Sequence, residues 1–286
     1  MSLGSEWEAG FPSSCLTVSI GPSLILILPT QQMGHVRVAK HRGPRLHVKP
    51  GLALGGSVEL ETGQAHYLRS VLRLGRGAAV AGFNAADGEW LCRIAEVGKN
   101  RVWLTVEHQL RMPEPDADLW LLFAPIKRAR SDWLVEKATE LGASALLPVW
   151  TARTQSERLN LERLRAHAVE AAEQSERLSV PELHRPEAFD RVLAAWPAER
   201  PLMVCDESGA GKPISEAARR LAPGPLAVLV GPEGGFDQTE LDALGKLSFV
   251  TRIGLGPRVL RAETAALAAL AVFQAIAGDW RRTRTR

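Results

Sequence analysis

The sequence predicts an α/β protein in which a small β-rich domain precedes a domain built on a parallel sheet. Short apolar runs separated by turn clusters fill residues 36–111, a pattern that is typical of a small barrel. A cluster of prolines and acids at 112–118 then marks a domain boundary. Behind it, apolar runs alternate with amphipathic stretches, which indicates strands and helices in a parallel α/β layer.

Three parts of the chain are expected from these signals. Residues 35–112 form the barrel-like domain and residues 119–286 form the α/β domain. Residues 1–34 are interpreted as a poorly ordered N-terminal extension, with a short strand packed on a neighbour as the alternative. Their apolar stretch at 16–29 is interrupted and too short to span a bilayer as a helix. It also lacks the basic segment that precedes the apolar core of a secretory signal.

The first domain is expected to contain several short strands and one helix. The strand candidates are residues 45–49, 57–60, 78–81, 90–94 and 101–106. The helix candidate is 62–74, in which Leu68, Val71 and Leu72 recur at helical spacing. Arg69, Arg73 and Arg76 gather at its end. They either complement the dipole of the helix or contact RNA phosphates.

The second domain is expected to alternate buried strands with helices. The strand candidates are residues 119–124, 146–150, 201–206, 226–230 and 249–253. The helix candidates are 132–141, 161–177, 214–221, a helix between the glycine loop at 231–236 and the strand at 249–253, and a segment that begins at 262. Continuous apolar runs such as 226–230 are typical of strands that are buried on both faces.

Composition restricts the class of protein. With 45% hydrophobic and 23% charged residues, the 286-residue chain is an ordinary globular sequence. A net charge of +3 and a pI of about 8.9 permit nucleic-acid binding without requiring it. The three cysteines are widely spaced, so neither a zinc site nor a disulfide framework is indicated. We therefore expect a cytoplasmic protein with no metal and no membrane association.

Two phosphate-binding motifs are excluded by their spacing. A nucleoside-triphosphate loop around Gly211-Lys212 would need glycine at Asp206 and serine or threonine at Pro213. A dinucleotide fingerprint at Gly254 fails because Val259 stands where its third glycine should be.

Two glycine loops, at 231–236 and 254–261, follow consecutive strand candidates. Each loop alone is accounted for as a tight turn. Together, at the ends of neighbouring buried strands, they favour a site where a flat ligand lies against the backbone.

These stretches resemble the RsmE family, which belongs to the SPOUT class of S-adenosylmethionine-dependent RNA methyltransferases. The residues that carry the resemblance are Gly-Pro-Glu-Gly-Gly-Phe at 231–236, Leu-Gly-Pro-Arg-Val-Leu-Arg-Ala-Glu-Thr-Ala at 255–265, Glu-Lys-Ala-Thr-Glu-Leu-Gly at 136–142, Glu-Gln-Ser-Glu-Arg at 173–177 with Val180-Pro181, and His-Tyr-Leu-Arg-Ser-Val-Leu-Arg-Leu at 66–74. They extend in family order over residues 44–280.

The resemblance implies a PUA-like β-barrel in front of an α/β domain with a trefoil knot. It implies methylation of N3 of a uridine in 16S ribosomal RNA, within an assembled small subunit, by a homodimer. The apolar helix at 263–277 is then either a dimer interface or an ordinary core helix. The alternatives are another SPOUT enzyme, acting on transfer RNA or a ribose 2′-hydroxyl, and a non-catalytic RNA-binding module.

The resemblance also implies site residues. The S-adenosyl-L-methionine site would be lined by Gly231, Pro232, Glu233, Gly234, Gly235, Ile253, Leu255, Gly256, Leu260, Arg261, Glu263 and Thr264. Because N3 of uridine carries a proton, a base or a cation would assist the transfer. The candidates are Glu173 as base and Arg177, Lys137 or Arg261 as cations, although Glu173 and Arg177 also have the spacing of a helical surface pair. The candidate RNA contacts are Arg45, Arg69, Arg73, Lys127, Arg128 and Arg130.

Overall fold

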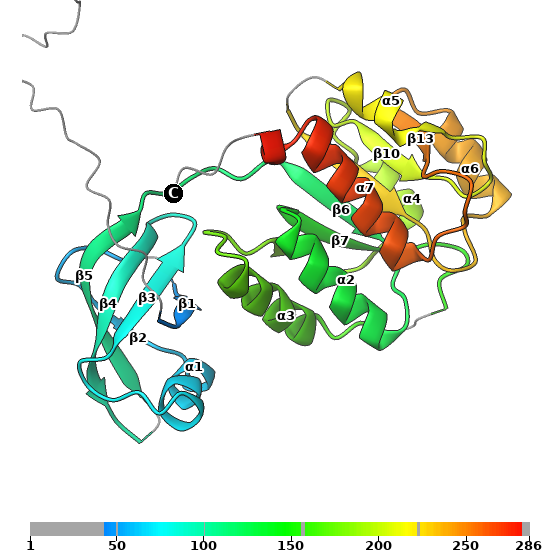
Figure 1. The fold of residues 1–286 in the computed structure, drawn as a ribbon. Helices are drawn as coiled ribbons and strands as arrows, with labels where there is room; N and C mark the ends of the chain where they lie inside the picture. Colours follow the sequence, from blue (N-terminus) through cyan, green and yellow to red (C-terminus); the bar gives the residue numbers. More distant parts are fainter. Residues whose placement is uncertain (1–42, 50, 100, 156–157, 222–223, 282–286) are drawn as a thin grey trace, which may run out of the picture. The chain divides into compact units, whose positions relative to one another are not determined.

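The computed structural model describes residues 43–49, 51–99, 101–155, 158–221 and 224–281, so the prediction for residues 1–34 lies outside the described residues. Two sheets are present in this range, a five-stranded sheet and, later in the chain, a parallel sheet with helices (Figure 1). The predicted α/β class with a β domain in front is therefore confirmed. The domain limits and the trefoil knot stay predictions.

The first sheet has the strand order β1-β3-β4-β5-β2. Its members are β1 (Arg45–His47), β2 (Ser57–Glu59), β3 (Ala79–Asn84), β4 (Gly88–Val97) and β5 (Val102–Arg111). The register between β4 and β5 shifts at three points. Such bulges bend and twist a sheet, so that one face can enclose a core. That core contains Leu46, Val80, Ile94 and Leu104, all buried.

The predicted helix at 62–74 is only partly an α-helix. The chain forms α1 (Thr62–His66) and then a single π-helical turn, η1 (Tyr67–Val71). The amide of Leu72 donates to the carbonyl of Tyr67, five residues earlier, at 3.0 Å. Arg73 follows with a positive φ of 55°. Helical spacing of three apolar residues could not reveal this, because over so short a segment it does not separate an α turn from a π turn.

The second sheet has the order β11-β13-β10-β12-β6-β7-β8, and β9 pairs with β7. Its strands are β6 (Leu119–Phe123), β7 (Ala145–Trp150), β8 (Glu182–Leu183), β9 (Glu187–Ala188), β10 (Leu202–Cys205), β11 (Lys212–Pro213), β12 (Leu226–Val230) and β13 (Val250–Gly254). The helices are α2 (Arg128–Glu140), α3 (Leu161–Gln174), α4 (Phe189–Ala194), α5 (Ile214–Arg219), α6 (Gln238–Gly245), α7 (Ala262–Ile276) and a 3₁₀ turn, η2 (Asp279–Arg281). All the pairings are parallel, as the alternating pattern predicted.

Strand β12 lies in the interior and contributes to two cores. Leu226, Val228 and Val230 pack into the core that includes residues of α2, α3, α5 and α7. Ala227 and Leu229 pack into the core that includes residues of α4 and α6. Alternate side chains of a strand point to opposite faces of a sheet, so a strand covered on both faces must be apolar throughout. Burial on both faces therefore explains the continuous apolar run that predicted this strand.

In a parallel sheet the strands start at one edge and end at the opposite edge, so polar residues in the loops gather at two separate edges. We call the ends of β6, β7, β10, β12 and β13, with the loops after them, the carboxyl edge. The starts of β6, β7 and β8, with the loops before them, form the amino edge. A five-residue strand separates the two edges by about 17 Å. Among the described helices, none is both long and apolar enough to cross a membrane.

Candidate functional site

Both glycine loops lie at the carboxyl edge, one after β12 and one after β13. Three of their glycines are required by the fold itself. A side chain at Gly231 would begin 3.0 Å from the buried ring of Phe236. Gly235 and Gly256 have φ values of +67° and +97°, which side-chain-bearing residues rarely adopt. These three positions therefore need no ligand to explain them.

Gly234 is different, because its backbone and surroundings would accept a side chain. Its φ is not in the left-handed region, and an added Cβ would meet only the Arg153 side chain, at 3.5 and 3.6 Å. Arg153, in the loop after β7, donates from Nη1 to the Gly234 carbonyl at 2.8 Å. Gly234 is exposed at the carboxyl edge, so a ligand could approach its backbone there, beside the Arg153 side chain.

The predicted wall of the ligand site is apolar and comes from the second loop. Ile253 is fully buried, and Leu255 and Leu260 are half-buried and pack against the larger core. Pro232 is buried in the first loop. Such a surface suits the faces of a flat ring, with backbone groups available at its edge.

Arg130, in the first turn of α2, joins the first loop to the first turn of α7. Its Nη1 lies 3.4 Å from Oε1 of Glu233, and its Nε lies 3.5 Å from Oε1 of Glu263. Glu263, in the first turn of α7, is buried, and its Oε2 has no hydrogen-bond partner within the described residues. A buried carboxylate oxygen without a donor is unusual in proteins. Oε2 of Glu263 is therefore an available acceptor among the predicted cofactor residues, and it could accept a hydrogen bond from an amino group of a ligand.

Asp206 stabilises the same edge from the end of β10. Its carboxylate lies 2.7 Å from Nη2 of Arg252 on β13 and accepts a 2.9 Å hydrogen bond from the amide of Ser208. Burial acts to raise the pKa of Asp206, but the bonds from Ser208 and Arg252 outweigh it and hold the pKa below its usual value. The ionised carboxylate therefore attaches the loop after β10 to the neighbouring strand.

Exposed cations lie beside the glycine loops. Lys127 and Arg128 are exposed at the start of α2, where the amide groups of a helix N-terminus also attract anions. Arg261 is exposed at the start of α7, and Thr264 is exposed one turn into it. The structure thus brings together at one edge all the predicted cofactor residues, one candidate catalytic cation and three candidate RNA contacts, of which Arg130 is paired with Glu233 and Glu263.

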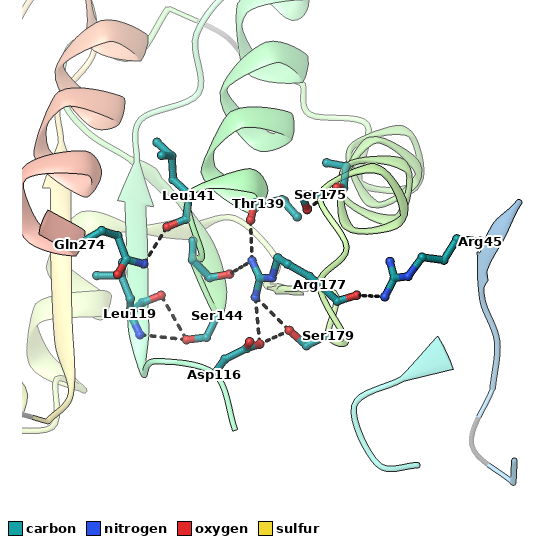
Figure 2. Close-up of polar contacts among 12 residues, drawn as sticks. Arg45, Asp116, Leu119, Thr139, Leu141, Ser144, Ser175, Arg177, Ser179 and Gln274 are labelled. Atoms are coloured by element: carbon teal, nitrogen blue, oxygen red, sulfur yellow. Dashed lines mark hydrogen bonds and ion pairs between the residues drawn. The ribbon is translucent and has the colours of Figure 1, made fainter. Parts of the chain in front are cut away.

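Arg177 is not part of this group. Figure 2 shows its guanidinium bound to the carbonyl of Thr139, to Asp116 and to Ser179. A further bond goes to the carbonyl of Ala143. These partners precede β6, β7 and β8, so Arg177 lies at the amino edge. Because its side chain is only 9% exposed and both of its Nη atoms donate to protein acceptors, we correct its assignment, within one chain, from a catalytic cation to a structural residue. Its buried Nε has no partner within the described residues.

Glu173 and Lys137 also lie toward the amino edge, in the last turns of α3 and α2. Glu173 accepts a 2.9 Å hydrogen bond from the amide of His47 in β1. Burial raises the pKa of Glu173. Lys137 forms ion pairs with Glu136 and Glu140, and hydrogen bonds from its ammonium to them raise its pKa. Within one chain, neither residue is placed to act on a substrate at the glycine loops.

Arg45 is the second correction, because it is not exposed for RNA. Its side chain is 11% exposed and forms a 2.7 Å ion pair with Glu89. Its guanidinium lies over the ring of Phe83 and donates to the carbonyls of Ala172, Glu173 and Arg177 at the end of α3. Arg45 therefore joins β1 to α3. Arg69 and Arg73, in contrast, are exposed on the β domain, as an RNA contact requires.

Sequence reasoning missed Arg153 and Glu207, which follow β7 and β10. An added Cβ at Gly235 would lie 1.7 Å from Oε1 of Glu207, so the side chain of Glu207 covers Gly235. Both residues could have been found by position, because polar residues directly after buried strands of a parallel sheet share the carboxyl edge.

A cavity of about 280 Å³ lies away from the glycine loops, against the first residues of β10 and β13. Its lining includes Pro201, Phe249 and Arg220 and none of the predicted site residues. The described residues also contain no group of three or more histidines, cysteines or acids that could hold a metal ion.

Comparison with known proteins connects this geometry to a family. The profile of a family described as an RNA methyltransferase domain matches residues 113–274, and that of an RNA methyltransferase PUA domain matches residues 60–107. A ribosomal RNA small subunit methyltransferase E from Rickettsia conorii is 33% identical over 230 residues, which cover 79% of this chain and 93% of the relative. The protein of the same name from Synechocystis is 30% identical over 267 residues, 91% of this chain and 86% of that relative.

Solved structures extend the likeness to the fold. A ribosomal RNA small subunit methyltransferase E from Neisseria gonorrhoeae, crystallised with S-adenosyl methionine, superimposes with a TM-score of 0.76 at 27% identity. The superposition covers 83% of this chain and 99% of that chain. It therefore includes both the β domain and the parallel sheet.

Proposed function

The chain belongs to the ribosomal RNA small subunit methyltransferase E family of RNA methyltransferases, and from this premise we propose that it methylates N3 of a uridine in 16S ribosomal RNA, with S-adenosyl-L-methionine as the donor. The observation that carries the proposal is the carboxyl edge of the parallel sheet. Two glycine loops, an apolar wall, a buried carboxylate with an unpaired oxygen and exposed cations meet there.

The residues of this edge fit the cofactor. Ile253, Leu255 and Leu260 would contact the adenine ring, and the space beside Gly234 would let it lie against the backbone. The unpaired Oε2 of Glu263 would accept a hydrogen bond from an amino group of the cofactor. When bound, S-adenosylmethionine supplies a methyl group on a sulfonium, which is already reactive, so alignment is the main task of the protein.

The N3 proton of uridine must leave before or during the transfer. Glu233 and Glu263 both lie against Arg130, whereas Arg261 is exposed at the start of α7. A guanidinium in that place would stabilise the negative charge that develops on the uridine oxygens as the proton leaves to water. We therefore assign the catalytic cation to Arg261, and we assign no base to the amino-edge residue Glu173.

The RNA would be bound from both domains. Lys127 and Arg128 at the carboxyl edge, together with Arg69 and Arg73 on the β domain, are exposed cations. Phosphate contacts of this kind position RNA without reading its sequence. Because these cations do not form one continuous stripe in the sequence, the fit depends on the folded RNA of an assembled small subunit. We place the enzyme in the cytoplasm, where that particle is assembled.

A homodimer is part of the proposal. Helices α2 and α7 pack side by side, and the amide of Gln274 in α7 donates to the carbonyl of Leu141 at the end of α2 (Figures 1 and 2). Trp133 of α2 and Trp280 of η2 are large exposed apolar residues. Small residues such as Ala271 and Ala275 of α7 are at least partly exposed. Large exposed aromatics, together with small residues exposed on a helix, suit contact with a second copy.

Methylation of purified particles tests the function. Small ribosomal subunits from a strain that lacks this protein are incubated with the chain and S-adenosylmethionine, and the nucleosides of the 16S RNA are analysed by mass spectrometry. We expect 3-methyluridine to form in the particle and to form poorly in free 16S RNA. The Arg261→Ala variant should lower kcat about a hundredfold with little change in cofactor affinity.

Arg258→Ala is the matched control, because Arg258 is exposed in the same loop. Its kcat should stay close to that of the unchanged protein. Methylation of transfer RNA or of a ribose hydroxyl would point to the other SPOUT activities. A chain that binds the particle but transfers no methyl group to any RNA would contradict the enzymatic proposal.

A further inference from the structure

The π-helical turn of the β domain is an unusual piece of backbone on an exposed surface. Besides the bond from Leu72 to Tyr67, the amide of Leu74 donates to the carbonyl of Leu68 at 2.9 Å, so the turn is wide. Arg73 closes it in the left-handed region, with φ 55°, although arginine gains nothing locally from that conformation. Single π turns and strained residues of this kind occur frequently at functional sites.

The wide turn presents apolar side chains to solvent. Leu68 is fully buried and attaches the turn to the core of the β domain. Tyr67, Val71 and Leu72 are 42%, 60% and 37% exposed. Tyr67 is the only tyrosine of the chain. Three neighbouring exposed apolar residues do not stabilise the isolated domain, and clusters of this kind mark surfaces that bind a partner.

The charge around the turn selects the kind of partner. Residues 62–78 contain no aspartate or glutamate, and they carry His66, Arg69, Arg73 and Arg76, which are all exposed. A small cavity of about 70 Å³ lies beside the turn, and basic side chains, among them Arg69 and Lys99, line it. Arg69 is held there by bonds from Nη1 to the carbonyls of Gly98 and Lys99. An exposed aromatic ring followed by three exposed arginines, with no acid in residues 62–78, is complementary to a polyanion with flat rings.

We propose that this surface, which we call the π-turn surface (Tyr67, Arg69, Val71, Leu72, Arg73 and Arg76), binds an unpaired nucleotide of the RNA substrate. Tyr67 stacks on the base, with Val71 and Leu72 beside it, and the arginines contact the adjoining phosphates. Stacking on an aromatic ring requires a base that has left its helix, so the surface selects a loop or a single strand over a duplex. The inference rests on the proposed function, since it assigns this surface to the RNA that is methylated.

Substitution of Tyr67 tests the stacking. Tyr67→Ala should raise KM for the small subunit about tenfold and leave kcat and cofactor affinity unchanged, because one stacked base contributes that much to affinity. Tyr67→Phe should retain normal KM. The control is Leu54→Ala, since Leu54 is an exposed apolar residue of the same domain outside the turn. A fluorescent single-stranded oligouridine, measured by anisotropy, should lose affinity for Tyr67→Ala to the same degree, whereas a duplex should not.

Substitution of Arg73 tests the phosphate contacts separately from folding. Arg73→Gly removes the charge and suits a positive φ, so thermal stability should not fall. Affinity for the oligouridine should fall. The slope of log affinity against log salt should become shallower by about the amount that one phosphate contact contributes.

The outcomes separate this inference from the proposed function. If no RNA is methylated but Tyr67→Ala still weakens oligouridine binding, the π-turn surface stands and the enzymatic proposal fails. Equal KM values for Tyr67→Ala and Leu54→Ala would overturn the π-turn surface. So would a loss of particle affinity without a loss of oligouridine affinity, because the surface would then bind a ribosomal protein.

Discussion

Two neighbouring positions of the first loop, Gly234 and Gly235, are glycine for different physical reasons. Gly235 is required by its backbone, since its φ is +67°, whereas Gly234 has an ordinary φ and room for a side chain. The motif at 231–236 marks both positions equally. Backbone conformation therefore requires glycine at 235 but not at 234, where an added Cβ would meet only the Arg153 side chain.

This difference predicts opposite phenotypes for the same substitution. Gly234→Val should keep the melting temperature and abolish detectable S-adenosylmethionine binding in calorimetry, because the side chain would fill the space beside the ring. Gly235→Val should lower the free energy of unfolding by about 1–3 kcal/mol, because a β-branched residue is strained at positive φ. Normal cofactor affinity in Gly234→Val would move the ligand away from this loop.

Residue roles were the least predictable part of the site. The sequence shows that Arg45 and Arg177 are cations, but not that Glu89, Asp116 and backbone carbonyls enclose them. Glu89 is 44 residues from Arg45 in sequence and Asp116 is 61 residues from Arg177, and only the tertiary fold brings them into contact. The glycine loops were predictable because their signal is local.

At the scale of elements, the pair between Asp206 and Arg252 attaches the loop after β10 to β13. We expect Asp206→Asn to lower the free energy of unfolding at pH 7 by about 2 kcal/mol, since a buried charged hydrogen bond is lost. The pKa of Asp206 is lowered in the folded state, so the stability it contributes is fully present above the usual value of 3.8 and is lost as pH falls through the folded value.

Urea unfolding between pH 7 and pH 3 checks this prediction. The difference between the unchanged protein and Asp206→Asn should be constant at neutral pH and should shrink once the pH falls below about 3.8. A difference in the free energy of unfolding that persists unchanged to the lowest pH would contradict the prediction. It would show that the shape of the Asp206 side chain, and not its charge, stabilises the fold.

Elements with a long apolar signal were predicted well. The strand at 226–230 coincides with β12, and the helix at 161–177 with α3 apart from its last turn. Strands β8, β9 and β11 and helix α4 were missed, because two to six residues are too few to display a period. The helix at 132–141 begins earlier, at Arg128, where charged residues hide the apolar pattern.

At the scale of the whole molecule, Arg45 joins the β domain to α3. Arg45→Ala should lower the free energy of unfolding by about 3 kcal/mol, because Glu89 would be left buried with weaker compensation and three carbonyls would lose a donor. Lys49→Ala is the control, since the ion pair of Lys49 with Glu61 is exposed and contributes little.

Chemical denaturation of the three proteins measures the effect. Cofactor affinity should be the same in all of them, because Arg45 lies against the end of α3 and not at the carboxyl edge. A loss of RNA binding in Arg45→Ala without any loss of stability would restore the original assignment of this residue to RNA. The trefoil knot stays a prediction, and periodicity cannot provide it, because a knot depends on the path of the chain and not on its pattern.

The order of strands also has a consequence for how the protein acquires its activity. Strand β10 pairs with β12 on one side and with β13 on the other, so it separates the strands that carry the two glycine loops. Residues 202–205 must be paired with both strands for the two loops to hold their places. A cofactor that contacts both loops would bind only the chain in which β10 is paired on both sides. Such a cofactor would stabilise the finished fold by mass action.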